Sequence, residues 1–418
     1  MAACNPPRWL QFQLLPADGR AAQVEVEVSH LHDFFTVTRR QLDLSGGRME
    51  VWTAAAAAIC AVAASWKLSE ICGYRCDTCS VALGGACLHA RLVLCGAVLF
   101  CCCFAGFCVA ARRRKLLPVQ DRAVLVTGCD SGFGQALAVR LSAAGLKVFA
   151  AVLDVDGAGA QRLRARALEN LQVLQLDVTD SSQAQTAFGY ICSQVADTGL
   201  WALVNNAGVL HCPVVAELQP LAAFRRCMDT NFLSAVHMCQ LFLPLLRRSR
   251  GRIVNVSSMA GEVPMPMLGA YGASKAALSI LSRVMRLELS AWGVKVALIQ
   301  PAGFRTNIFG DGDDVARYKD ELLAAVSPEA RADYGEAYIS SAPHCLSIMS
   351  QQSAVDLSPV VEDMFHAVLA VCPRPLYTPG KMGWLLPFLH RCCPTSWFDA
   401  IIAGLPQYSQ CQPAGLRT

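Results

Sequence analysis

Short apolar segments rich in β-branched residues alternate with longer alanine- and leucine-rich segments along the chain after Asp121. This alternation predicts β-α-β units, whose strands form a parallel sheet with helices on both faces. We therefore expect an α/β, doubly wound domain of the Rossmann type, in which ligands bind at the carboxyl ends of the strands. The six expected strands are residues 123–128, 147–154, 171–178, 200–208, 251–258 and 294–303.

A glycine-rich stretch, TGCDSGFG at 127–134, follows the first expected strand and opens a helix-forming segment. Its spacing is G-x-x-x-G-x-G, and the glycines permit a tight turn and close approach of backbone, helix and ligand. The N-terminus of the helix then offers free N–H groups to a pyrophosphate. The stretch therefore predicts a dinucleotide site. The residues expected there are Gly128, Ser131, Gly132, Phe133 and Gly134.

The second expected strand ends at Asp154, twenty residues after Gly134. A carboxylate in this place accepts hydrogen bonds from the adenosine ribose and repels a 2′-phosphate. No Lys or Arg lies between Cys129 and Phe133, and Val155 follows the aspartate, so no nearby cation would neutralise that phosphate. The pattern favours NAD over NADP. The alternative is a solvated loop aspartate.

The segment YGASK places Tyr271 and Lys275 four residues apart, on one face of an expected helix. A tyrosine with a pKa of about 10 is a poor base at neutral pH, but an adjacent ammonium stabilises its phenolate. Ser258 ends a preceding strand and can donate a hydrogen bond to a substrate oxygen. We expect Ser258 and Tyr271 to bind the reacting oxygen of the substrate.

Six motifs in order, TGCDSGFG, LDVT, NNAG, NVSS, YGASK and PAGFRT, resemble the short-chain dehydrogenase/reductase family over residues 121–310. The resemblance implies that Tyr271 is the catalytic base and that Lys275 lowers its pKa and holds the nicotinamide ribose. It also implies that Ser258 orients the substrate and that Asn231 completes a proton relay. One departure is Ala302, where the family usually has glycine.

The same resemblance extends the expected cofactor site to residues outside the glycine-rich stretch. It places Asp177 near the adenine and Thr306 near the carboxamide or the phosphates. Asn205 and Ala207 belong to the NNAG motif that supports the strand beside the cofactor. The implied cofactor is NAD.

Longer matches between about Leu116 and Ile402 resemble the membrane-anchored hydroxysteroid dehydrogenases of this family. They imply NAD-dependent oxidation of a steroid 17β-hydroxyl to the ketone, with a homodimer as an expected assembly. Oxidation of an 11β-hydroxysteroid or of a retinol is the alternative within the class. A catalytically inactive nucleotide-sensing or membrane scaffold is the alternative outside it, and the complete set Asn231, Ser258, Tyr271 and Lys275 argues against that.

Residues 92–111 contain no charge, and twenty residues suffice to cross about 30 Å of hydrocarbon as a helix. The cluster RRRK at 112–115 follows directly, so the positive-inside rule places the rest of the chain in the cytoplasm. We expect attachment to the endoplasmic reticulum membrane. The alternative is a buried core helix. Residues 51–66 form either a second span or an interfacial segment.

These observations divide the chain into four parts. Residues 1–48 are a polar extension, either disordered or an alternative start region, and 49–115 are the membrane anchor. Residues 116–347 form the catalytic domain, with a substrate lid after Asn307, and 348–418 form a C-terminal region. Its segment 384–402 either dips into a membrane surface or packs as a helix pair.

Composition excludes other classes of protein. The net charge of +4, without aromatic residues among the basic ones, does not indicate nucleic-acid binding. The 21 cysteines are scattered or lie in apolar runs, which is typical of reduced thiols. The spacing from Cys72 to Cys79 lacks a second pair of ligands, so we expect no metal. The segment PMPML at 264–268 either contacts an apolar substrate or fills gaps in its loop.

Overall fold

The computed structural model describes residues 115–166, 168–211, 213–310, 312–404 and 414–416. The polar extension 1–48 and the segments 51–66 and 92–111 lie outside these ranges. Within these ranges no helix has the length and apolar character needed to cross a bilayer.

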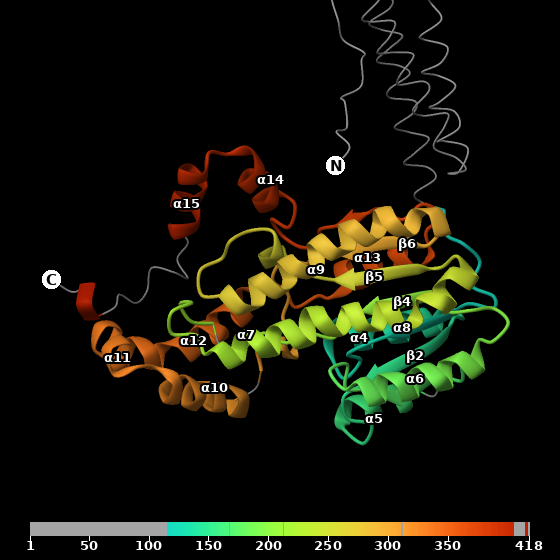
Figure 1. Ribbon diagram of the computed structural model, residues 1–418, viewed down its shortest axis with the longest axis horizontal. Helices are drawn as coiled ribbons and strands as arrows, with labels where there is room; N and C mark the ends of the chain where they lie inside the picture. The colour runs from blue at the N-terminus through green and yellow to red at the C-terminus, as the bar shows by residue number, and fades with distance from the viewer. Residues whose placement is uncertain (1–114, 167, 212, 311, 405–413, 417–418) are drawn as a thin grey trace, which may run out of the picture. The chain divides into compact units, whose positions relative to one another are not determined.

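A seven-stranded parallel sheet forms the centre of the described domain, in the order β3-β2-β1-β4-β5-β6-β7 (Figure 1). The six expected strands are confirmed, each shorter than its apolar segment. The order reverses between β1 and β4, where a crevice for a ligand forms at the carboxyl ends. The strands are β1 (Ala123–Val126), β2 (Lys147–Val152), β3 (Leu171–Gln175), β4 (Ala202–Asn205), β5 (Arg252–Val256), β6 (Lys295–Ile299) and β7 (Leu376–Tyr377).

Helices cover both faces of the sheet because successive side chains of each strand point to opposite faces. In β1, Val124 and Val126 join one apolar cluster, whereas Ala123 and Leu125 join the other. The first cluster is covered by α4 (Gly132–Ala143), α5 (Ala158–Arg164) and α13 (Ser358–Leu369). The second is covered by α6 (Ser181–Gln194), α8 (Ser234–Ser249) and α9 (Gly269–Glu288), which cross in front of the sheet in Figure 1.

Two further groups of helices lie beyond the carboxyl ends of the strands (Figure 1). The segment after Asn307 is mostly helical and forms α10 (Gly312–Ala325), α11 (Pro328–Tyr334) and α12 (Glu336–Gln352). The C-terminal segment forms a hairpin of α14 (Leu385–Cys392) and α15 (Thr395–Ala403). The remaining elements are α7 (Leu221–Met228), the π-helical turn η1 (Asp229–Leu233) and the 3₁₀ turns η2 (Met259–Gly261), η3 (Leu289–Trp292), η4 (Asn307–Phe309) and η6 (Ala414–Leu416).

The expected boundary at residue 347 falls within α12. The chain after it returns to the sheet, because α13 packs against the first cluster and β7 pairs with β6. Leu116, at the start of the described domain, forms a β-bridge with Ala370 at the end of α13. The C-terminal region thus holds the start of the described domain, at Leu116, and completes the sheet beside β6.

Candidate active site

The glycine-rich loop follows β1 at the switch point and depends on the absence of side chains. Gly128 and Gly132 have φ values of +67° and +59°, which L-residues rarely adopt. A Cβ on Gly134 would lie 2.3 Å from the carbonyl oxygen of Gly128, and one on Gly128 would lie 2.8 Å from Cα of Ala207. The loop is therefore folded tightly at the N-terminus of α4, where N–H groups without helical partners can receive a pyrophosphate.

Two side chains that the sequence analysis did not single out hold this loop in place. The amide Nδ2 of Asn206 donates to the carbonyl oxygens of Thr127 and Gly128, at 2.9 and 3.1 Å. The hydroxyl of Thr127 accepts from the backbone N–H groups of Asn206 and Ala207, both at 3.0 Å. Both residues belong to motifs that the sequence displays, because Asn206 is the second asparagine of NNAG and Thr127 precedes the first glycine of TGCDSGFG.

Asn205, the first asparagine of NNAG, points into the sheet and is buried. Its Nδ2 donates to Oδ1 of Asn255 on β5 at 2.8 Å and to Sγ of Cys239 at 3.3 Å. The structure therefore gives Asn205 a part in joining β4 to β5, whereas Asn206 contacts the glycine-rich loop.

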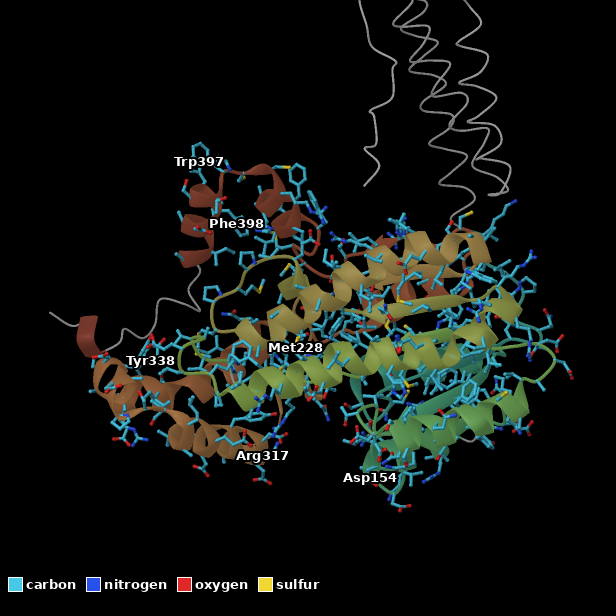
Figure 2. The ribbon with its side chains drawn as sticks, viewed as in Figure 1. Asp154, Met228, Arg317, Tyr338, Trp397 and Phe398 are labelled. Carbon is cyan, nitrogen blue, oxygen red and sulfur yellow. The ribbon has the colours of Figure 1, made fainter. Side chains whose placement is uncertain are left out.

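Asp154 lies exposed on the loop after β2 (Figure 2), where its Oδ1 accepts from the N–H of Asp156 at 3.0 Å. A second carboxylate, Asp130 of the glycine-rich loop, accepts from the N–H of Leu153 at 2.9 Å. Two carboxylates therefore adjoin the end of β2. This arrangement suits ribose hydroxyls and opposes a 2′-phosphate.

The other expected cofactor residues lie around the same edge of the sheet. Thr306 contacts the glycine-rich loop, because a Cβ on Gly132 would lie 3.3 Å from its side chain. Phe133 packs edge to face against Phe304, with ring centroids 5.7 Å apart. Asp177, after β3, accepts from the N–H and the hydroxyl of Thr179 at 2.8 and 2.7 Å. Ser131 is the N-cap residue of α4 and makes no side-chain capping bond.

Ser258 lies close enough to Tyr271 for its hydroxyl to act on the phenol and lower the phenol's pKa. Ser258 follows β5 and caps η2, accepting from the N–H of Ala260 at 3.2 Å. Tyr271 lies in the first turn of α9, half-buried. The pair expected to bind one substrate oxygen is thus brought together from two elements.

The pKa of Tyr271 differs in direction from the sequence-based expectation. Burial raises it to about 12, while the Ser258 hydroxyl acts to lower it. Lys275 lies close, with Nζ 5.8 Å from the centroid of the phenol ring. Burial also lowers the pKa of Lys275 itself, to about 8. Below that pH the lysine keeps its charge and the tyrosine its proton.

Lys275 is almost fully enclosed, with 3% of its surface exposed, and Nζ donates to the carbonyl oxygen of Val256 at 2.9 Å. Cys227 is buried close by, and burial raises the pKa of its thiol to about 11, so it remains neutral. The ammonium is therefore fixed by one backbone carbonyl at the end of β5.

Asn231 occupies the π-helical turn η1 between α7 and α8, a local irregularity that is frequent at functional sites. Its side chain is buried and makes three bonds. Nδ2 donates to the carbonyl of Val209 and to the hydroxyl of Ser274, both at 2.9 Å, and Oδ1 accepts from the N–H of Val209 at 2.7 Å. Ser274 lies between Tyr271 and Lys275 on α9, so Asn231 adjoins the catalytic pair.

Gly208, the last residue of NNAG, shows how close these groups are. A Cβ there would lie 3.1 Å from both Oδ1 of Asn231 and Nζ of Lys275. The structure therefore brings all four expected catalytic residues to one place at the carboxyl edge of β4 and β5.

An apolar cluster packs against Tyr271 on the side of α12. Its buried members come from segments far apart in the sequence: Leu210 after β4, Leu268 before α9, and Leu346 on α12. Met265 and Phe309 pack against them. The phenol therefore faces an environment suited to an apolar ligand.

The departure at Ala302 has a local compensation. A Cβ on Gly380 would lie 3.0 Å from Cβ of Ala302, and Gly380 has a φ of +106°. The N–H of Ala302 still donates to the carbonyl of Pro379 at 3.0 Å. The extra methyl is thus accommodated opposite a glycine.

The residues present fit a dinucleotide, because the glycine-rich loop ends at the N-terminus of α4, where backbone N–H groups suit a pyrophosphate, and Asp130 and Asp154 lie beside the end of β2. Within the described ranges no group of three or more His, Cys, Asp or Glu side chains could hold a metal ion.

Comparison with known proteins agrees with this geometry. The profile of the family described as "short chain dehydrogenase" matches residues 122–314. Estradiol 17-beta-dehydrogenase 2 of Mus musculus is 44% identical over 80% of this chain and 88% of its own length. For 11-beta-hydroxysteroid dehydrogenase type 2 of Ovis aries the identity is 46%, over 68% of this chain and 66% of that protein.

Solved structures show the same fold. A short-chain dehydrogenase from Streptomyces avermitilis superposes with a TM-score of 0.53 at 24% identity, covering 69% of this chain and 96% of that one. A short chain dehydrogenase/reductase from Burkholderia phymatum, solved in complex with NAD, also gives a TM-score of 0.53, at 22% identity over 63% and 89% of the two chains. With a relative that shares 44% of its residues over most of its length, the chain belongs to the short-chain dehydrogenase/reductase family and is an oxidoreductase.

Proposed function

We propose that this protein oxidises the 17β-hydroxyl of a steroid to the ketone, with NAD as cofactor. The observation that carries the proposal is the Ser258–Tyr271 pair, brought together beside an apolar cluster and next to a glycine-rich, dinucleotide-type loop. The relatives named for steroid dehydrogenation support the substrate class. The paired carboxylates Asp130 and Asp154 support NAD.

When bound, NAD supplies the acceptor for the hydride that leaves the alcohol carbon. Ser258 and Tyr271 hold the alcohol oxygen between their hydroxyl groups. The phenolate of Tyr271, which the buried ammonium of Lys275 stabilises, takes the hydroxyl proton and becomes the neutral phenol. Asn231 fixes the loop after β4 and, through Ser274, the helix turn that carries Tyr271 and Lys275.

Two other alcohols remain alternatives within the same mechanism. The similarity to 11-beta-hydroxysteroid dehydrogenase type 2 favours an 11β-hydroxysteroid, and Retinol dehydrogenase 16 of Homo sapiens, 38% identical over 69% of this chain, favours a retinol. The apolar cluster suits all three, since each substrate is largely hydrocarbon.

A panel of alcohols tests the proposal. The full-length protein is incubated with 17β-hydroxysteroids, 11β-hydroxysteroids and all-trans-retinol, each with NAD and with NADP, and the absorbance of the reduced cofactor is followed. We expect the highest kcat/KM for a 17β-hydroxysteroid with NAD. A higher value for another alcohol selects that alternative, and no turnover with any alcohol refutes the proposal.

We also propose that residues 92–111 anchor the protein in the endoplasmic reticulum membrane with the catalytic domain in the cytoplasm. The uncharged stretch and the RRRK cluster after it support this orientation. A tag after Thr418 should be accessible to antibody when only the plasma membrane is permeabilised. Accessibility only after the inner membranes are opened would reverse the orientation.

A homodimer through α9 is the assembly that we propose. The outer face of this helix exposes Ile280, Val284 and Leu287, at 57%, 43% and 67% of their surface, in a row at helical spacing. Such a row is unusual on a surface helix and suits the same helix of a second copy. Val284→Asp should convert a dimer to a monomer in light scattering of the detergent-solubilised protein, and an unchanged mass would exclude this face.

A further inference from the structure

The C-terminal hairpin α14–α15 has two different apolar faces. Its inner face carries Leu386, Leu389, Phe398 and Ile402, which pack in one cluster with Met259 and Val263. These last two residues belong to the loop 259–268 that joins Ser258 to Tyr271. The hairpin therefore covers the loop that closes the catalytic site.

One methionine connects the hairpin to the catalytic residues. Met265 packs both against the hairpin cluster and against the apolar cluster that contains Tyr271. Between them the two clusters form a continuous apolar region from the catalytic phenol to the inner face of the hairpin.

An ion-pair network around one nearly enclosed carboxylate ties the same elements. The carboxylate of Glu262, on the loop, is only 10% exposed and accepts from Nε of Arg391 on α14 at 2.8 Å and from Arg283 on α9 at 2.6 Å. Gln300 adds a bond at 3.3 Å. The hairpin is thus attached to the substrate loop by charge as well as by apolar contact.

The outer face of the hairpin is apolar and open. Trp384, Phe388, Trp397 and Ile401 expose 64%, 53%, 69% and 43% of their surface. Figure 2 shows Trp397 directed away from the rest of the domain and its neighbour Phe398 directed inward. The charged neighbours are the exposed Lys381, the exposed Arg391, which also pairs with Glu262, and one acid, Asp399.

We propose that this outer face lies in the interfacial region of a lipid bilayer and that the apolar substrate reaches Tyr271 from the bilayer beneath the hairpin. Tryptophan and phenylalanine beside cationic side chains are typical of segments that rest in the headgroup region, where the cations meet anionic lipid. The role in substrate access rests on the proposed steroid function, whereas contact with lipid does not.

The experiment measures tryptophan fluorescence in the full-length protein, reconstituted in phosphatidylcholine–phosphatidylserine vesicles with and without brominated acyl chains. The test variant is Trp384→Ser with Trp397→Ser. The matched control is Trp292→Ser, which removes a tryptophan that is 58% exposed on η3, away from the loop 259–268. We expect the test variant to lose a large part of the bromine-quenched emission, and the control to lose none of it.

Equal quenching in the test variant and the wild type would overturn the proposal. So would emission from Trp384 and Trp397 that depends on protein density and not on bromine, which would indicate a second copy. No substrate is present in this measurement, so a chain inactive on every steroid would refute the proposed function and leave the lipid result standing.

Kinetics then test substrate access separately. With a steroid supplied in the same vesicles, the test variant should show a KM several-fold higher than the control, with kcat and NAD affinity unchanged. A merely structural role of the two tryptophans would lower kcat and thermal stability together. An unchanged KM would overturn the access role.

Discussion

The nucleotide-binding side and the substrate-binding side of this domain are built in different ways. On the nucleotide side, a short loop is fixed by glycines with positive φ and by hydrogen bonds between polar side chains and the backbone. Asn206 and Thr127 make these bonds. On the substrate side, apolar residues from distant segments meet in small clusters apart from the main core. The nucleotide-binding loop therefore tolerates few substitutions. The substrate-binding clusters can change residue by residue, so the same chemistry can serve different substrates.

The largest expected effect is on the catalytic base, which stands where the two sides meet. Tyr271→Phe removes the proton acceptor but keeps the ring, so turnover should fall by about two to four orders of magnitude. NAD affinity, measured separately by fluorescence titration, should change little. Lys275→Met should reduce both, because it removes the ammonium that serves the base and the ribose. Near-normal turnover by folded Tyr271→Phe protein would refute the mechanism.

On the nucleotide side, Gly134→Ala should abolish NAD binding or prevent folding. The added Cβ would meet the carbonyl oxygen of Gly128 at 2.3 Å and Nδ2 of Asn206 at 2.5 Å, and neither atom can move without opening the loop. Gly189→Ala is the matched control, because nothing lies within 4 Å of a Cβ there. NAD affinity and melting temperature would be compared, and normal values for Gly134→Ala would show that the loop is not rigid.

The pH dependence should reflect the burial of the catalytic pair. Burial raises the pKa of Tyr271 to about 12, so the phenolate fraction, and with it the initial rate of oxidation, should rise about tenfold per pH unit near neutrality. Above the lowered pKa of Lys275, about 8, loss of the ammonium should reduce this slope. Initial rates measured between pH 6 and 9 would give the slope of the oxidation rate against pH. A rate that is flat in this range would show that Tyr271 is already ionised at neutral pH.

Cofactor preference offers a smaller test of the nucleotide side. Asp154→Ser with Val155→Arg removes the carboxylate and adds a cation, so kcat/KM should shift from NAD toward NADP. Asp130 stays in place beside Leu153, and we therefore expect a partial shift. Equal use of NAD and NADP by the unsubstituted protein would contradict the assignment of Asp154.

The last test compares equal truncations of a buried leucine on the two sides. Leu125→Ala in β1 and Leu322→Ala in α10 both remove a side chain that is at most 1% exposed. The first should cost about 2–5 kcal/mol of the stability of the whole domain, because it opens a cavity under the sheet. The second lies in a satellite cluster with Val214, Leu218 and Ile339, so it should loosen the lid, raise the KM for substrate and leave NAD affinity unchanged.

Calorimetry and separate titrations of the two ligands would measure this difference. Similar losses of melting temperature for both variants would show that the lid and the sheet unfold as one unit, and the comparison between the two sides would fail.

The sequence by itself determined the sheet, the place of the nucleotide and the identity of the catalytic residues. Each depends on local information: the alternation of apolar segments, the conformational freedom of Gly128 and Gly132, and the four-residue spacing of Tyr271 and Lys275 along one helix. Because such features act over a few residues, their motifs can be read without a structure.

Only the tertiary structure decided the environment of those residues. Leu210, Leu268 and Leu346 meet around Tyr271 although 136 positions separate the first from the last, and no local pattern marks them. The raised pKa of Tyr271 is also absent from the motif, because desolvation depends on what the rest of the chain packs around the phenol. The return of α13 and β7 to the sheet, and the packing of α14–α15 over the loop 259–268, likewise depend on contacts between distant segments, which the sequence does not display.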